Sequence, residues 1–125
     1  MKRFRYGEKG FTLLEMLVVV AILGALTAVV IPNVVKFMNE GKEEAMLAEH
    51  HNLQTSVLAI LADADVHALD ATYTDRRERS EIHEVQARDA DDKVYYLDDY
   101  LIGGQWPLLQ SYDISQAGSV TVHPE

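Results

Sequence analysis

A run of twenty residues without a charge constrains this chain more than any other feature of its sequence. Between Met16 and Val35 most side chains are Val, Ile, Leu or Ala, and charged residues return only at Lys36. Twenty helical residues span about 30 Å, which is the hydrocarbon thickness of a bilayer. The run therefore predicts one membrane-spanning helix, and the 125-residue chain leaves room for one small polar domain after it.

The charges of the chain are divided unevenly around this run. The formal net charge is −9, but residues 1–10 carry +3 and the remaining residues carry −12. An acidic body argues against nucleic-acid binding, which needs clustered Lys and Arg to neutralise phosphates. Basic residues before a membrane span predict that the N-terminus stays in the cytoplasm. The chain has no cysteine, which excludes disulfides and cysteine-based metal sites.

Glu15 lies near the start of the apolar run and is the only charged residue between Gly10 and Lys36. A carboxylate at the centre of a membrane costs about 2.5 kcal/mol or more, so a residue of this kind is a functional candidate. The other interpretation is that the side chain lies close enough to the end of the run to reach the polar interface, and has no further role.

Gly24 and Pro32 weaken the later part of the run as a helix. A proline inside a helix removes one backbone hydrogen bond and clashes with the preceding turn, at a cost of about 3 kcal/mol. Together with Thr27, these residues mark a stretch that can bend or unwind. A simple kink, which membrane helices tolerate, is the alternative interpretation.

The N-terminus is not built like a secretory signal peptide, in which a small-residue cleavage site follows the apolar run. Here a basic decapeptide ends at Gly10 and the apolar residues begin at once, in the string Lys9-Gly10-Phe11-Thr12-Leu13-Leu14-Glu15. This string resembles the class III signal of type IV prepilins and pseudopilins, in which a basic leader ends in glycine and a glutamate stands fifth after the cut. The resemblance extends from Lys9 to about Leu61, and beyond about residue 65 it is only architectural.

The resemblance implies a role for each of these residues. A membrane prepilin peptidase would cut the Gly10–Phe11 bond and N-methylate the new amine of Phe11. Glu15 would then pair with that ammonium, within the subunit or in a neighbour, and favour correct register during filament assembly. Gly24 and Pro32 would mark a helix-melting stretch. The implied partners are copies of the chain in a helical filament, the peptidase, an inner-membrane assembly platform with its ATPase, and membrane lipid before assembly.

Apolar residues continue at helical spacing after the membrane run. The stripe consists of Met46, His50, Leu53, Val57, Ile60, Leu61 and Ala64. It predicts an amphipathic helix over residues 36–65 that continues the membrane helix and packs on the head. One helix from about Phe11 to Asp65 would be roughly 80 Å long, which a small domain cannot bury. Its first half therefore needs lipid or other subunits.

The head, residues 66–125, is predicted to hold a polar connector, a short helix and a β-hairpin. Residues 66–92 form the connector, and its apolar side chains are few: Leu69, Tyr73, Ile82 and Val85. Its charged run, residues 75–81, is expected to be a solvated loop or short helix, or alternatively a contact with a neighbouring subunit. Residues 94–101 are expected to be the short helix. The alternating segments 109–114 and 119–123 predict the hairpin.

The expected fold class is α+β, with a long N-terminal helix packed on a small C-terminal β-hairpin head. Four segments follow: a removable leader (1–10), a transmembrane and assembly helix (11–35), an amphipathic helix continuing into the head (36–65), and the head itself (66–125).

No enzyme motif or cofactor motif occurs in the sequence, so we expect neither catalysis nor a cofactor. The five histidines lack the spacing of metal ligands. Asp89, Asp91 and Asp92 resemble part of a calcium loop, but the glycine and the terminal glutamate of an EF-hand are missing. These three residues are weak calcium candidates and no more.

Three functions remain open at this point. The first is a structural subunit of a type IV pilus, which would leave the cytoplasmic membrane and end in an extracellular filament. The second is a major pseudopilin of a type II secretion system, which would form a periplasmic pseudopilus. The third is a single-pass anchored binding module that never polymerises.

Overall fold

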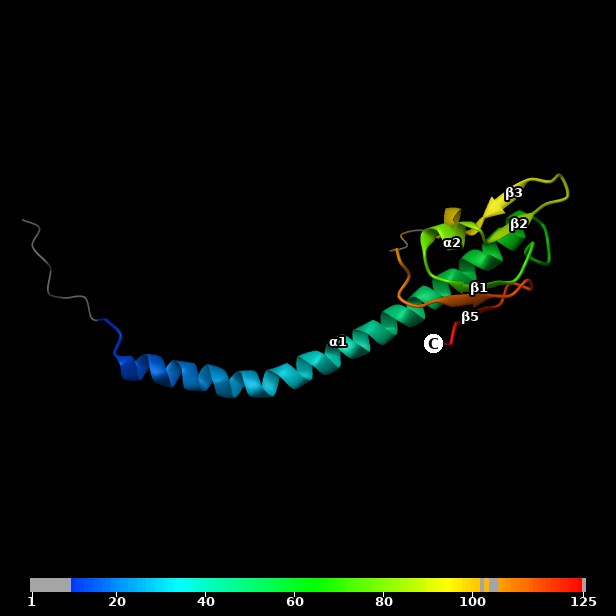
Figure 1. Cartoon of the computed structure of the whole chain (residues 1–125). Coiled ribbons are helices and arrows are strands. Elements are labelled where there is room, and N and C mark those ends of the chain that lie inside the picture. The colour runs from blue at the N-terminus through cyan, green and yellow to red at the C-terminus, as the bar shows by residue number, and fades with distance from the viewer. Residues whose placement is uncertain (1–9, 102, 104–105, 125) are drawn as a thin grey trace, which may run out of the picture. The chain divides into compact units, whose positions relative to one another are not determined.

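The computed structural model describes residues 10–101, 103 and 106–124. Apart from Gly10, the expected leader lies outside these residues. The chain forms two compact units, one reaching to Gly41 and one beginning at Lys42. Within the described residues the elements are α1 (Leu13–Asp63), β1 (Tyr73–Arg76), α2 (Arg79–His83), β2 (Gln86–Arg88), β3 (Val94–Tyr96), the 3-10 turn η1 (Leu97–Asp99), β4 (Tyr112–Ile114) and β5 (Val120–Val122) (Figure 1).

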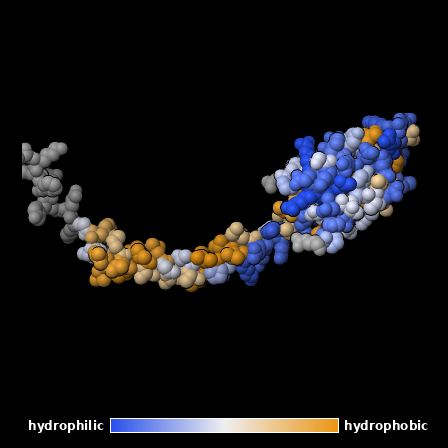
Figure 2. All heavy atoms as spheres, in the orientation of Figure 1, coloured by the Kyte–Doolittle hydropathy of each residue, from blue (hydrophilic) through white to orange (hydrophobic). Residues whose placement is uncertain are grey.

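The first unit contributes the apolar part of α1, and nothing in the described chain covers it. Every residue from Gly10 to Gly41 is exposed. The space-filling view shows hydrophobic residues gathered over this unit, whereas the surface of the second unit is mostly hydrophilic on the face shown (Figure 2). The single long helix that the sequence predicts is confirmed, with an apolar window of mean hydropathy 2.7 that is long enough to cross a membrane.

Helix α1 ends in a reversal that its own backbone stabilises. Asp65 adopts a left-handed conformation with φ 52°, and the Val66 N–H donates to the Leu61 carbonyl at 3.0 Å. This is the hydrogen bond of a Schellman-type helix end, in which a left-handed residue turns the chain and satisfies a free carbonyl. The chain is thereby directed back to build the head.

Two small antiparallel sheets make up the β part of the second unit. One has the order β1-β4-β5, and the other pairs β2 with β3. The β4–β5 pair joins Tyr112 to Val122 and Ile114 to Val120, so the hairpin predicted over residues 109–123 is confirmed. Strand β1 adds to it as a third strand, which the sequence pattern did not predict.

The apolar stripe of α1 forms one wall of the core. Leu53, Val57 and Ile60 are fully buried, and Leu61 and Ala64 nearly so. They share one cluster with residues of the sheets and turns, including Ile82, Leu97, Leu108, Tyr112 and Ile114. Met46 and His50, at the start of the stripe, are only half-buried. The stripe was therefore predicted correctly, and its burial fades towards the first unit.

Polar side chains of α1 hold the hairpin in place. Gln54 accepts from the Val120 N–H at 2.9 Å and donates to the Gly118 carbonyl at 2.7 Å, while His50 Nε2 contacts the Val120 carbonyl at 3.0 Å. The two Val120 groups belong to the edge strand β5, and the Gly118 carbonyl belongs to the turn before it. Without these hydrogen bonds, the free backbone groups of the edge strand could pair with another chain.

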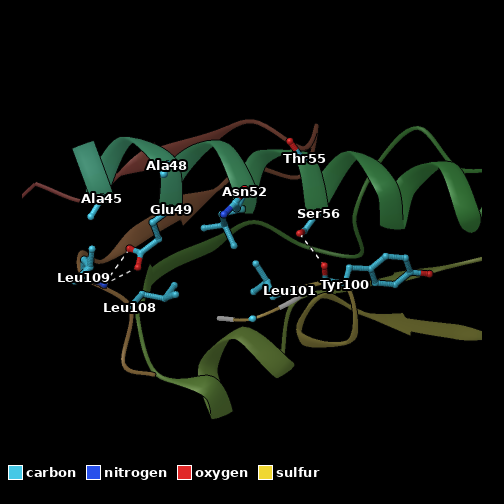
Figure 3. A pocket seen from close by; sticks show the side chains of 12 residues that line it. Ala45, Ala48, Glu49, Asn52, Thr55, Ser56, Tyr100, Leu101, Leu108 and Leu109 are labelled. Atoms are coloured by element: carbon cyan, nitrogen blue, oxygen red, sulfur yellow. Dashed lines mark hydrogen bonds between the residues drawn. The ribbon is translucent and has the colours of Figure 1, made fainter. Parts of the chain in front are cut away.

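Glu49 ties the same helix to the segment that leads into β4. Its carboxylate accepts from the Leu109 N–H at 2.9 Å (Figure 3). It also accepts from the Tyr112 hydroxyl at 2.9 Å. Burial of Tyr112 and its hydrogen bond to Glu49 raise the pKa of this phenol. About two turns further along α1, also shown in Figure 3, the Ser56 hydroxyl donates to the Tyr100 carbonyl at 3.1 Å.

The helix predicted over residues 94–101 is wrong. Val94–Tyr96 is strand β3, paired with β2, and only residues 97–99 form a single 3-10 turn. The Leu97 N–H donates to the Val85 carbonyl, which extends the strand pairing by one residue. Val and Tyr favour strands, and pairing with β2, which lies shortly before β3 in the sequence, prevails over the helical spacing of the apolar residues.

The expected polar connector is more ordered than its composition suggests. Residues 66–92 contain β1, α2 and β2, and the charged run lies at the end of β1 and the start of α2. The four larger apolar anchors of the segment, Leu69, Tyr73, Ile82 and Val85, are all buried, with Ile82 and Val85 fully so. These few buried side chains are enough to order the segment because each of them packs in the same core as the buried stripe of α1.

Gly118 is the glycine on which the hairpin depends. It adopts φ +83° in the turn between β4 and β5, and an added Cβ would lie 2.8 Å from Leu61 Cδ1. We expect Gly118→Ala to cost about 1–3 kcal/mol, because both the backbone conformation and the close approach to α1 oppose a side chain. Thermal unfolding of the full chain in detergent should show a midpoint lower by at least several degrees.

Gly41→Ala is the matched control for this variant. Gly41 lies within α1, and an added Cβ would meet nothing within 4 Å. The midpoint should stay the same or rise, since alanine is favoured over glycine in a helix. Equal midpoints for both variants would contradict the role given to Gly118.

Candidate functional site

The expected cleavage bond lies in an open, non-helical segment before α1. Gly10 and Phe11 precede the first helical residue, Leu13, and the Phe11 side chain is 80% exposed. A side chain at Gly10 would meet nothing within 4 Å. The fold of the described chain therefore does not require glycine at this position. Any requirement for glycine there would come from a protein that acts on the Gly10–Phe11 bond.

Glu15 closes a reciprocal cap on the first turn of α1. The Thr12 N–H donates to Glu15 Oε2 at 2.8 Å, and the Glu15 N–H donates to Thr12 Oγ1 at 3.2 Å. This is a capping box, which satisfies two backbone donors at the helix start. A carboxylate in the first turn also interacts favourably with the positive end of the helix dipole. Glu15 thus has a role within the subunit, in addition to any pairing with another group.

Thr12 is the residue of this site whose role the sequence interpretation missed. The pattern Thr-x-x-Glu at residues 12–15 was a sufficient signal, because Ser or Thr followed three residues later by Glu marks a helix start. The cap brings Glu15 Oε2 to the backbone of Thr12, next to Phe11 in the chain. An amine formed at Phe11 would therefore arise beside a carboxylate already held in place.

Helix α1 is continuous through the stretch containing Gly24 and Pro32. Since proline has no N–H, the Ala28 carbonyl loses its usual helical donor. Two side chains reinforce the backbone on either side: Thr27 Oγ1 donates to the Leu23 carbonyl at 2.7 Å, and Asn33 Nδ2 donates to the Val29 carbonyl at 3.2 Å. The helix of the single chain is intact but contains one unpaired position.

Two of the three weak calcium candidates, Asp89 and Asp92, are engaged within their own turn. Asp89 Oδ1 accepts from the backbone N–H groups of Asp91 and Lys93, and these hydrogen bonds, the one from Lys93 foremost, lower the pKa of Asp89. Asp92 forms an ion pair with Arg88 at 2.9 Å. Within the described part of the chain, no group of three or more His, Asp or Glu residues is arranged to hold a metal ion.

Comparison with known proteins places this N-terminal segment in context. Residues 5–31 match the model of the prokaryotic N-terminal methylation motif. The chain is 35% identical to the type IV major pilin protein PilA of Myxococcus xanthus (strain DK1622) over 65 residues, which are 52% of this chain and 30% of the relative.

Two further relatives each match about half of the chain. The fimbrial protein EcpB of Eikenella corrodens is 34% identical over 65 residues, 52% of this chain and 41% of its own length. The type IV major fimbrial protein FimA of Dichelobacter nodosus is 34% identical over 56 residues, 45% of this chain and 36% of its own. The match thus spans only about a third of each relative's length. No solved structure matches the chain.

The methylation motif covers the capped helix start and most of the apolar run that follows it. Helix α1 begins within the motif and has the length and composition of a helix that can cross a membrane. With the pilin relatives, these features show that the chain is similar to type IV pilins over about half of its length.

Proposed function

We propose that this chain is the precursor of a structural subunit of a type IV pilus. The observation that carries the proposal is the first unit itself, in which an apolar helix is exposed from Gly10 to Gly41. An apolar surface of this extent is unfavourable in water, so lipid or other protein must cover it. Lipid covers it before assembly, and the helices of other copies cover it in the filament.

In this proposal a prepilin peptidase cuts the Gly10–Phe11 bond and methylates Phe11. The exposed, non-helical position of that bond supports cleavage there, because a protease needs extended chain. The precursor spans the inner membrane once with its basic N-terminus in the cytoplasm. An assembly platform and its ATPase then extract the subunit from the membrane into an extracellular filament. The chain itself is a structural protein and carries out no chemistry.

The maturation step predicts a defined N-terminus. Intact-mass analysis of filaments should show loss of residues 1–10 and the addition of one methyl group at Phe11. We expect Gly10→Leu to insert into the membrane normally and to remain uncut, because the fold has room for a side chain there whereas a protease subsite for glycine has none. Assembled subunits that retain Met1, or normal cutting of Gly10→Leu, would contradict the proposal.

The location of the filaments separates the two polymer functions. Sheared extracellular filaments that contain the mature chain indicate a pilus. Filaments confined to the periplasm would instead assign the pseudopilin function. A membrane-bound chain that never polymerises would leave only the anchored binding module.

Glu15 is proposed to pair with the Phe11 ammonium of its own or a neighbouring subunit. We expect Glu15→Ala and Glu15→Gln both to be cut normally and to yield few filaments. The unpaired ammonium would cost about 3 kcal/mol or more per subunit in a dry filament core. Filament yield is measured against the subunit pool remaining in the membrane.

The capping box allows the charge of Glu15 to be tested separately from its hydrogen bonds. Glu15→Gln keeps a side chain that can cap, whereas Thr12→Val keeps the charge and loses one cap bond. If charge pairing governs assembly, Glu15→Gln should fail and Thr12→Val should assemble. The opposite result would assign the role of Glu15 to the helix start alone.

The stretch from Gly24 to Pro32 is proposed to unwind in the filament. In the single chain it is helical, with one carbonyl left without its helical donor at Pro32, so little structure is lost when it extends. A filament map should show extended backbone there, and Gly24→Ala with Pro32→Ala should reduce filament yield by stabilising the helix. A continuous helix across these residues in wild-type filaments would show that melting does not occur.

A further inference from the structure

Most basic side chains of the described chain already have a partner. There are seven Lys and Arg residues in this part, and five are engaged. The pairs are Lys36–Glu40 at 3.8 Å, Arg76–Glu84 at 2.7 Å, Arg79–Asp98 at 3.7 Å, Arg88–Asp92 at 2.9 Å, and Lys93 over the Tyr95 ring at 4.5 Å. Lys42 and Arg77 have no ion-pair partner among the described residues.

These two cations line the same hollow in the second unit. The hollow has a volume of about 710 Å³, and its polar wall includes Lys42, Arg77, Gln110, Ser111 and His123. We call it the basic hollow. Asp75 is the one acidic residue of the wall. The Arg77 guanidinium is held there by donation from Nε to the Leu108 carbonyl at 2.9 Å, which leaves its remaining N–H groups for another acceptor.

Two unpaired cations are unusual on so acidic a protein. Residues 11–125 carry a net charge of −12, so carboxylates are abundant, and four of the other five basic residues form an ion pair with one. The basic hollow combines a concave shape, cationic side chains and amide and hydroxyl donors. This is the chemistry that recognises a carboxylate or another anion.

A matching acidic feature lies at the other end of the same unit. The turn between β2 and β3 carries Asp89, Asp91 and Asp92, and it projects from the end of the head opposite the C-terminal segment (Figure 1). Arg88, at the base of the turn, contacts Asp70 beyond the end of α1. Met46, in the wall of the hollow, is about 25 Å from that end of the helix at 1.5 Å per residue.

Asp91 is the free carboxylate of this turn. Asp89 is occupied by backbone donors and Asp92 by Arg88. The side chain of Asp91 is exposed and makes no hydrogen bond or ion pair within the described part of the chain. Basic hollow and acidic turn are too far apart to meet within one molecule, so they can meet only between copies.

We propose that the basic hollow of one subunit receives the acidic turn of the next subunit, with Asp91 directed at Lys42 and Arg77. Such a contact joins two different surfaces, and a contact of this heterologous kind continues indefinitely as a helical polymer unless it closes into a ring. The proposal rests on the proposed polymeric function. It adds a contact between heads to the packing of the N-terminal helices, and it sets the axial register of neighbouring heads.

A charge swap in the full chain tests the contact. Lys42 is chosen because it is exposed and holds no other part of the described fold, unlike Arg77. We expect Lys42→Glu alone and Asp91→Lys alone each to reduce filament yield several-fold, with normal cleavage and a normal membrane pool. The double variant Lys42→Glu/Asp91→Lys should restore the yield, since it restores the pair with its signs exchanged.

The matched control is Lys42→Glu/Glu43→Lys. It has the same net charge as the wild type but places the cation one position along α1, outside the wall of the hollow. It should not restore the yield. Equal rescue by both double variants would show that only net charge matters, and normal filaments from Lys42→Glu would show that the hollow is not a contact. A loss that Asp91→Lys fails to restore would assign another occupant to the hollow. Each of these outcomes overturns the proposal.

Disulfide trapping gives a direct measurement, because the chain has no cysteine of its own. Filaments carrying both Lys42→Cys and Asp91→Cys should form a ladder of disulfide-linked subunits on mild oxidation, and neither single variant should do so. Filaments that form normally without a ladder contradict the contact and leave the proposed function intact. Absence of filaments from the wild type would instead contradict the proposed function.

Discussion

The exposed apolar half of α1 is the constraint on which the rest of the protein depends. From Gly10 to Gly41 the helix presents large hydrophobic side chains that no other described residue covers. A soluble domain would bury them, and a chain with a head this small cannot. The apolar surface is therefore not buried within one molecule. In the proposed function, it is buried first in lipid and then against the helices of other copies.

The second half of the same helix organises the head by different means. Its buried stripe supplies the core, and Glu49, His50 and Gln54 supply hydrogen bonds to the backbone of the β4–β5 region. These polar contacts matter because both sheets are very small, and isolated hairpins are at best marginally stable in water. One continuous helix thus serves two purposes: an apolar surface open to other molecules, and a scaffold for a compact unit that carries an acidic turn and a basic hollow.

Several features were predictable because each rests on local sequence. The helix, its apolar run and its buried stripe follow from hydrophobic periodicity, and the hairpin follows from alternation around Gly118. The predicted helix over residues 94–101 failed although its pairing partner, β2, also lies close in the sequence. Val94, Leu97 and Leu101 have helical spacing, but strand β2 offers Val94–Tyr96 a pairing partner, and the pairing prevails over the spacing. The capping box at Thr12 and Glu15 also rests on local sequence, because the spacing Thr-x-x-Glu marks a helix start.

By itself, the sequence determined that one helix of this protein must lie in an apolar environment, that a basic decapeptide ending at Gly10 precedes it, and that an acidic segment follows it. These properties depend on composition and spacing along the chain, which need no knowledge of contacts. Only the tertiary structure decided that β1 joins the hairpin, that Ile82 and Val85 complete the core, and that Lys42 and Arg77 line one hollow. The reason is physical. Residues 42, 77 and 123 are brought together by backbone pairing and burial across the whole head, and no local pattern records which distant residues a folded chain makes into neighbours.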